Sequence, residues 1–264
     1  MKRSIAIIII FIGVQIICSL MGLLWVNRSS LISGISFDNN SLNSNLTVLG
    51  ISLLSSSLLT VGILWLLGWI RFFERFRKSI SILLYTCMIL ILFPVIFLTN
   101  LFAEFLSLPD WTQQQFQGMS SNGWCILSMV VIAPISEEYI FRAGILRAFI
   151  RQNYAPWKAI IISSILFALI HMNPNQIVAA FVLGILFGWL YTRSCNIWLA
   201  IIAHMINNSL GVVSMYVVES NKKTTLIESL GGGTSLFLAV LASFVVAGLL
   251  AWYVNRNLPA HHFS

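Results

Sequence analysis

The chain has 264 residues, of which 58% are hydrophobic and only 9% are charged, and its formal net charge is +7. Soluble globular domains carry about 25% charged residues, so this composition excludes a soluble protein and indicates an integral membrane protein. The positive charge does not indicate nucleic-acid binding, because the Lys and Arg residues flank apolar runs, where membrane topology places them.

The apolar runs predict an all-α, polytopic membrane protein. A helix needs about 20 apolar residues to cross a bilayer, and a chain in lipid must satisfy its own backbone hydrogen bonds. The runs are continuous rather than alternating, which favours helices over a β-barrel. A bundle of about eight spans is predicted, at about 5–26, 47–70, 79–100, 122–150, 158–172, 175–192, 197–218 and 234–254.

We expect one integral membrane domain over residues 1–264. Residues 1–118 hold the N-terminal spans, residues 119–218 hold spans with polar motifs, and residues 219–264 hold a C-terminal span. The apolar core of the first span has about 20 residues, more than the 7–15 of a signal peptide. The first span is therefore interpreted as a retained anchor.

The distribution of basic residues predicts the orientation. If the N-terminus is cytoplasmic and eight spans alternate, 12 Lys and Arg residues fall on the cytoplasmic side and 3 on the outer side. Because cytoplasmic loops are enriched in Lys and Arg, both termini are predicted to be cytoplasmic. The compact loops are typical of a multi-pass protein of a prokaryotic cell membrane.

Two adjacent glutamates, Glu137 and Glu138, interrupt the fourth apolar run. A carboxylate at membrane depth costs about 2.5–3.5 kcal/mol on insertion scales, so such residues indicate a functional site. Glu138 and Arg142 are four residues apart and can pair on one helical face, whereas Glu137 is about 140° around the helix from Arg142. Glu137 is therefore a candidate general base, and Pro134 is expected to kink or loosen the helix just before it.

Three later motifs also place polar or small residues in apolar spans. His204 and Asn208 share a helical face, as do Phe167 and His171. Counting along each span brings these residues and the glutamates to compatible depths, about 18–20 Å from the span ends. A lone histidine or asparagine in a span is usually a helix–helix hydrogen-bonding group, so the argument for a site depends on their joint occurrence. A further pair, Gly184 and Gly188, predicts close helix packing.

These motifs resemble those of the CPBP family, which comprises CAAX proteases, bacteriocin-processing enzymes and abortive-infection-like proteins. The matching residues are Glu137-Glu138-x-x-x-Arg142, Phe167-x-x-x-His171 and His204-x-x-x-Asn208, in that order on successive spans. The resemblance implies an intramembrane glutamate-dependent endopeptidase.

The resemblance also implies a role for each residue. Glu137 would activate water, and His171 would assist with that water or with proton transfer. His204 and Asn208 would stabilise the oxyanion, and Glu138 and Arg142 would support the site. The substrate would be a prenylated CAAX-type C-terminus, a leader peptide or a membrane protein, and the compact loops favour the last two.

Other functions are compatible with the same residues. Glu137, His171 and His204 could form a zinc site with an open position, although the sequence has no HExxH motif; otherwise we expect no metal or cofactor. A non-catalytic immunity or scaffold protein could retain the cluster for packing or for binding a peptide. A proton-coupled transporter would be expected to show an inverted repeat, and none is visible in the sequence.

The expected partners are a peptide or membrane-protein substrate and the lipid bilayer, with no nucleic acid. The oligomeric state is left open.

Overall fold

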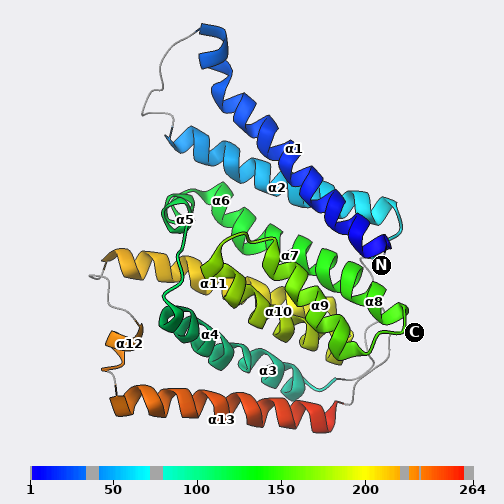
Figure 1. Ribbon diagram of the computed structural model, residues 1–264, viewed down its shortest axis with the longest axis vertical. Coiled ribbons are helices and arrows are strands. Elements are labelled where there is room, and N and C mark those ends of the chain that lie inside the picture. The colour runs from blue at the N-terminus through cyan, green and yellow to red at the C-terminus, as the bar shows by residue number, and fades with distance from the viewer. Residues whose placement is uncertain (1, 34–41, 72–79, 221–225, 232, 259–264) are drawn as a thin grey trace. The chain divides into compact units, whose positions relative to one another are not determined.

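The computed structural model describes residues 2–33, 42–71, 80–220, 226–231 and 233–258 (Figure 1). This described part consists of helices and turns and contains no strand, so the predicted all-α class is confirmed. Several basic residues used to predict the orientation lie outside it: Arg75, Arg77, Lys78, Lys222 and Lys223.

Within the described residues, seven helices are long and apolar enough to cross a membrane: Arg3–Val26, Asn45–Leu66, Ile82–Leu106, Gly123–Arg151, Pro174–Ser194, Ile197–Met215 and Gly233–Asn257. They correspond to seven of the eight predicted spans. The remaining one, predicted at 158–172, is the shorter helix Pro156–Leu169. Its 14 residues extend about 21 Å, which is less than the hydrocarbon thickness of about 30 Å.

Large apolar side chains are exposed along several of these helices. Ile9 is 65% exposed, Leu66 77% and Ile82 81%. Continuous apolar surface of this kind is unfavourable in water and favourable in lipid. The exposure pattern therefore agrees with an integral, multi-pass membrane protein.

The chain forms two compact units, and each unit contains two separate segments of sequence. Unit 1 comprises Met1–Phe72 and Thr112–Ile145, and unit 2 comprises Phe73–Trp111 and Leu146–Ser264. The predicted glutamate motif therefore lies in unit 1, and both histidine motifs lie in unit 2.

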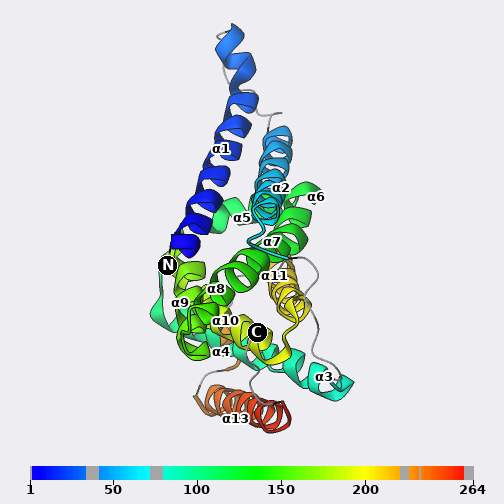
Figure 2. The ribbon, with the colours of Figure 1, turned by 90° about the vertical axis from the view of Figure 1, so that its right-hand side faces the viewer.

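Unit 1 contains a pair of long helices and an irregular helix. Its elements are α1 (Lys2–Ser33), α2 (Leu42–Leu66), α5 (Gln113–Ser120), α6 (Gly123–Leu127), η2 (Ser128–Ile132), α7 (Ala133–Glu138) and most of η3 (Tyr139–Leu146). Helices α1 and α2 lie side by side (Figures 1 and 2).

A close contact joins α2 to α6 and to the first residue of η2. The Ser128 hydroxyl donates to the Gly50 carbonyl over 2.7 Å, and the Cys125 thiol donates to the Leu46 carbonyl over 3.1 Å. A Cβ atom on Gly50 would lie 2.7 Å from the Cys125 nitrogen, so only glycine permits this approach.

Unit 2 contains α3 (Ile82–Leu90), α4 (Leu92–Leu106), α8 (Arg147–Arg151), α9 (Pro156–Leu169), α10 (Pro174–Ser194), α11 (Ile197–Ser220), α12 (Leu226–Ser229) and α13 (Gly233–Asn257). Helix α10 packs against α4, α9 and α11, and α13 packs against α3 and α4 (Figure 2).

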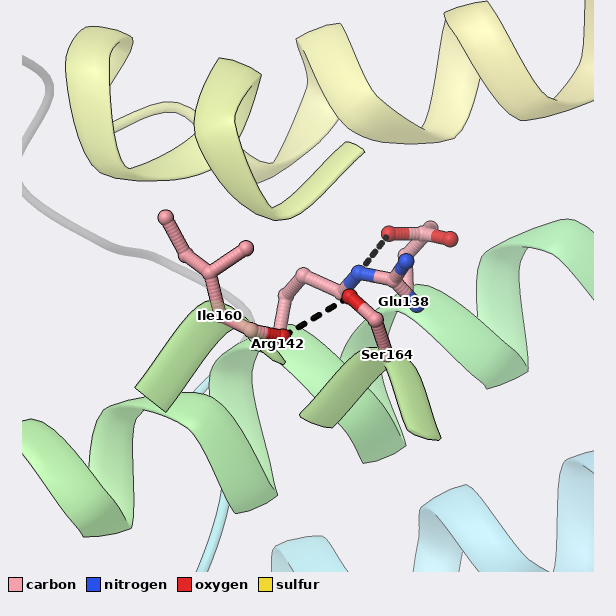
Figure 3. Close-up of polar contacts among 4 residues, drawn as sticks. All are labelled: Glu138, Arg142, Ile160 and Ser164. Atoms are coloured by element: carbon pink, nitrogen blue, oxygen red, sulfur yellow. Dashed lines mark hydrogen bonds and ion pairs between the residues drawn. The ribbon is translucent and has the colours of Figure 1, made fainter. Parts of the chain in front are cut away.

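The predicted close packing at Gly184 and Gly188 is confirmed on the face of α10 that meets α9. A Cβ on Gly184 would lie 3.1 Å from the Ser164 Cβ, and one on Gly188 would lie 3.1 Å from Ile160 Cγ2. The Ser164 hydroxyl donates to the Ile160 carbonyl of its own helix over 2.7 Å, which satisfies this buried polar group (Figure 3).

Candidate functional site

The glutamates lie on a short α-helix that has a π-helical segment on each side. Helix α7, which carries Glu137 and Glu138, follows the π-helical turn η2 and precedes the π-helical segment η3. Pro134 has no N–H to bond to the preceding turn, and the Ala133 N–H bonds to the Ser128 carbonyl, five residues back. The predicted loosening at Pro134 is therefore confirmed, and π-helical turns of this kind are frequent at functional sites.

Glu138 and Arg142 form the predicted ion pair. The Arg142 Nε lies 3.0 Å from Glu138 Oε2 (Figure 3), and both residues are completely buried. Each side chain compensates the charge of the other where water does not reach. A supporting role agrees with this burial, because a fully covered carboxylate is poorly placed to meet a substrate.

Glu137 has a different environment from Glu138. It is partly exposed, whereas Glu138 is buried. Arg142 interacts electrostatically with Glu137 as well as with Glu138. Arg142 itself lies in the π-helical segment η3, one turn after the two glutamates. Glu137 combines a nearby positive charge with access from outside the fold.

His171 lies in the turn after α9 rather than within a span, which corrects the sequence-based placement. Helix α9 ends at Leu169, and the His171 N–H bonds to the Ala168 carbonyl over 3.1 Å in a tight turn. The His171 Nδ1 lies 2.9 Å from the Phe167 carbonyl. A carbonyl oxygen can only accept, so Nδ1 is the donor, and in the neutral ring Nε2 carries the lone pair. Nε2 can accept a proton or bind a metal ion.

An aromatic cluster joins His171 to His204. The ring of Phe167 lies edge-on to both imidazoles, with centroids 5.0 Å from His171 and 5.6 Å from His204. Phe187 of α10 stacks on His204 at 5.0 Å with the planes 24° apart. The structure thus brings together two predicted site residues, one from the turn after α9 and one from α11. Phe187 was missed by the sequence analysis, because a phenylalanine in an apolar helix carries no distinctive signal.

Asn208 lies one turn after His204 on the regular helix α11, so the two side chains share a face as predicted. The Asn207 amide nitrogen donates to Asn208 Oδ1 over 3.1 Å. This bond orients the Asn208 side chain with its N–H donors on the opposite edge. Asn207 is therefore an orienting neighbour whose role sequence spacing did not reveal.

The described residues contain no group of three or more His, Cys, Asp or Glu side chains that could hold a metal ion. The zinc hypothesis requires Glu137 from unit 1 and both histidines from unit 2, and it stays a prediction. The convergence of Glu137 with His171, His204 and Asn208 also stays a prediction.

Comparisons with known proteins concern the same part of the chain. Residues 119–210 match the family described as Type II CAAX prenyl endopeptidase Rce1-like. The predicted site residues all fall inside this segment: Glu137, Glu138, Arg142, His171, His204 and Asn208.

Two curated proteins are similar to the chain. Putative membrane peptidase YdiL of Bacillus subtilis is 31% identical over 117 residues, which is 43% of this chain and 46% of that protein. Probable CAAX prenyl protease 2 of Schizosaccharomyces pombe is 26% identical over 140 residues, which is 46% of this chain and 50% of that protein. The chain thus spans about half the length of these relatives. No solved structure matches it.

Proposed function

We propose that the chain is a membrane-embedded endopeptidase of the CPBP family that uses a water molecule activated by Glu137. The match of residues 119–210 to the Rce1-like family and the similarity to two curated proteins support this assignment. The observation that carries the proposal is the contrast between the two glutamates. Glu138 is buried against Arg142 at 3.0 Å, whereas Glu137 is partly exposed. A catalytic carboxylate must reach water and substrate, so Glu137 is the better candidate.

In the proposed reaction, the Glu137 carboxylate removes a proton from water, and the hydroxide attacks the carbonyl carbon of the scissile peptide bond. The carbonyl oxygen becomes an oxyanion, which accepts hydrogen bonds from His204 and Asn208. Cleavage of the C–N bond then transfers a proton to the leaving amine, from protonated Glu137 directly or through His171 Nε2. The products are a carboxylate and an amine, and no covalent enzyme intermediate forms.

The unit 2 geometry supports these roles for His171 and Asn208. The bond from His171 Nδ1 to the Phe167 carbonyl directs the basic lone pair to Nε2, as proton transfer requires. The bond from Asn207 orients Asn208 with its donor group away from that neighbour. Stacking on Phe187 fixes the plane of His204.

The proposed substrate is a peptide or membrane protein that reaches the active site from the bilayer. One relative is named as a probable CAAX prenyl protease, and the other is named as a putative membrane peptidase. A leader peptide or membrane protein is proposed ahead of a prenylated substrate, because the compact loops are typical of a prokaryotic protein. We also propose that both termini are cytoplasmic, as the distribution of Lys and Arg favours.

The decisive test compares peptide termini in cells that carry the wild-type protein or Glu137→Ala. Glu104→Gln serves as a matched control, because Glu104 is also acidic but accepts hydrogen bonds from the Leu226 and Ile227 N–H groups of α12. Processed termini should be present with wild type and the control and absent with Glu137→Ala. Identical termini in all three strains would contradict protease function and favour an immunity or scaffold protein.

The substrate class is tested with purified protein in lipid vesicles. Three peptides are compared: a prenylated CAAX peptide, the same peptide without its prenyl group, and a membrane-spanning peptide with a leader sequence. Preference for the prenylated peptide over its unmodified form would contradict the proposed substrate class while supporting the endopeptidase activity.

A further inference from the structure

The Asp110 carboxylate lies at the centre of a hydrogen-bond network in unit 2. Asn173 Nδ2 donates to Asp110 Oδ1 over 2.8 Å, and Asn175 Nδ2 donates to Asp110 Oδ2 over 3.3 Å. The Trp111 N–H donates to Asn173 Oδ1 over 3.3 Å. The network attaches the segment after α4 to two places. Asn173 belongs to the turn between α9 and α10, and Asn175 belongs to the first turn of α10.

The side chain of Asn173 serves this network rather than its own helix. Asn173 is the N-cap residue of α10, and an N-cap asparagine normally accepts a hydrogen bond from the first turn of its helix. Within the part of the chain that the structure describes, the Asn173 side chain forms no such cap bond. It is fully buried, and its oxygen accepts from Trp111 instead.

The turn held by this network carries His171. Met172, between His171 and Asn173, has a φ of 50°, in the left-handed region that residues with a Cβ rarely adopt. Such a conformation persists only when surrounding contacts maintain it. The His171 ring is bonded to the carbonyl of Phe167 at one edge of the turn, and the Asp110 network holds the other edge through Asn173. The direction of Nε2 therefore depends on support from outside the turn.

We infer that Asp110 is a positioning residue for His171, which it acts on by holding the turn between α9 and α10 through Asn173 and the first turn of α10 through Asn175. The catalytic part of this inference rests on the proposed function. Asp110 lies outside the segment 119–210 that matches the family, so none of the motifs described above includes it.

The first experiment measures the accessibility and reactivity of the imidazole without requiring catalysis. Diethyl pyrocarbonate modifies unprotonated imidazole nitrogens, and mass spectrometry reports His171 and His204 separately in one sample. In Asp110→Asn, which preserves side-chain size, and in Asp110→Ala, the His171 labelling rate should change by about two- to tenfold, the range set by the net strength of one hydrogen bond. His204 should react at its wild-type rate. Unchanged labelling of His171 in both variants would overturn the inference.

Glu104→Gln is the control for these variants. In the wild-type protein, the Glu104 carboxylate accepts hydrogen bonds from the Leu226 N–H over 2.9 Å and from the Ile227 N–H over 3.2 Å. Glu104 therefore holds α12 rather than the turn with His171. Labelling of His171 in Glu104→Gln should match wild type. A change equal to that in Asp110→Asn would show general loosening of the fold and would also overturn the inference.

The second experiment measures peptide cleavage. Misplacement of a catalytic group by about 1 Å can lower the rate about 10²-fold, so Asp110→Asn should lower kcat by about 10- to 100-fold with KM changed less than about twofold. The double variant Asp110→Ala/Asn173→Ala should be no slower than the slower single variant, because both changes disrupt one network.

Wild-type kcat in Asp110→Asn despite altered labelling would overturn the catalytic part of the inference. A wild-type protein that cleaves nothing would contradict the proposed function, and the labelling would still decide whether Asp110 positions His171.

Discussion

The glutamate segment of unit 1 and the histidine cluster of unit 2 are supported in different ways. The glutamates lie beside π-helical turns, and Glu138 is neutralised by Arg142 at 3.0 Å. The histidines lie among phenylalanine rings and are oriented by Phe167 and Phe187. A buried carboxylate requires a counter-charge, because its desolvation is costly, whereas a neutral imidazole requires mainly a fixed plane and tautomer.

The largest effect is expected for Glu137. Glu137→Gln should lower the rate of peptide cleavage by about 10²–10⁴-fold, the usual contribution of a general base, with little effect on thermal unfolding in detergent. Stability should change little because Glu137 is partly exposed and the amide has the same size as the carboxylate. Single-turnover cleavage in lipid vesicles provides the measurement. Residual activity close to wild type would assign the water-activating role to another residue.

Loss of Arg142 should instead destabilise the fold. Arg142→Met leaves the buried Glu138 carboxylate without the ion pair seen at 3.0 Å, and breaking a buried pair costs about 3–5 kcal/mol. Thermal and chemical unfolding in micelles report this loss. The double variant Glu138→Gln/Arg142→Met should recover most of the stability, because no buried charge remains. A double variant that is less stable than Arg142→Met would argue against the pair as a mutual neutraliser.

The room for a Cβ atom is smaller at Gly50 in unit 1 than at Gly184 in unit 2. Gly50→Ala places a Cβ 2.7 Å from backbone nitrogen in unit 1, whereas Gly184→Ala places one 3.1 Å from a side-chain carbon in unit 2. Overpacking costs about 1–3 kcal/mol, so Gly50→Ala should lie at the upper end of this range and Gly184→Ala lower. Gly62→Ala on α2 is the control, because its Cβ would meet no atom of the described residues within 4 Å. Equal unfolding free energies for the three variants would contradict the close approach of neighbouring atoms to Gly50 and Gly184.

A smaller effect is expected at the aromatic support of His204. Phe187→Leu removes the ring stacked at 5.0 Å, and aromatic pairs contribute about 0.5–1.5 kcal/mol beyond their buried area. The cleavage rate should therefore fall by about two- to tenfold, with KM nearly unchanged. Phe181→Leu on the same helix is a control of matched chemistry. Equal losses in both variants would indicate a packing effect rather than orientation of His204.

No effect is expected from removal of metal ions. The proposed reaction uses Glu137, His171, His204 and Asn208 and requires no cation, so cleavage should persist after treatment with a strong chelator. Inactivation that zinc reverses would favour the alternative zinc site. His171 would suit that role as well, because its Nδ1 bond to a carbonyl is also typical of metal-bound histidines.

Local spacing predicted the parts of the site that depend on helix geometry. The Glu138–Arg142 pair, the shared face of His204 and Asn208, and the packing of Gly184 and Gly188 all follow from residues three or four apart on a helix. Spacing was less reliable at the end of a helix. His171 lies in a turn rather than in a span, because α9 ends at Leu169.

The amino-acid sequence by itself determined the helical membrane class, the approximate spans and the identity of the candidate site residues, because apolar length, helical period and the high cost of charge in lipid act locally along the chain. Tertiary structure decided which neighbours orient those residues. Phe167 lies against both histidines, Phe187 lies on His204, and Asp110 holds the turn after His171. These contacts join residues up to 63 positions apart, and they depend on how the helices pack, which no local pattern of residues encodes.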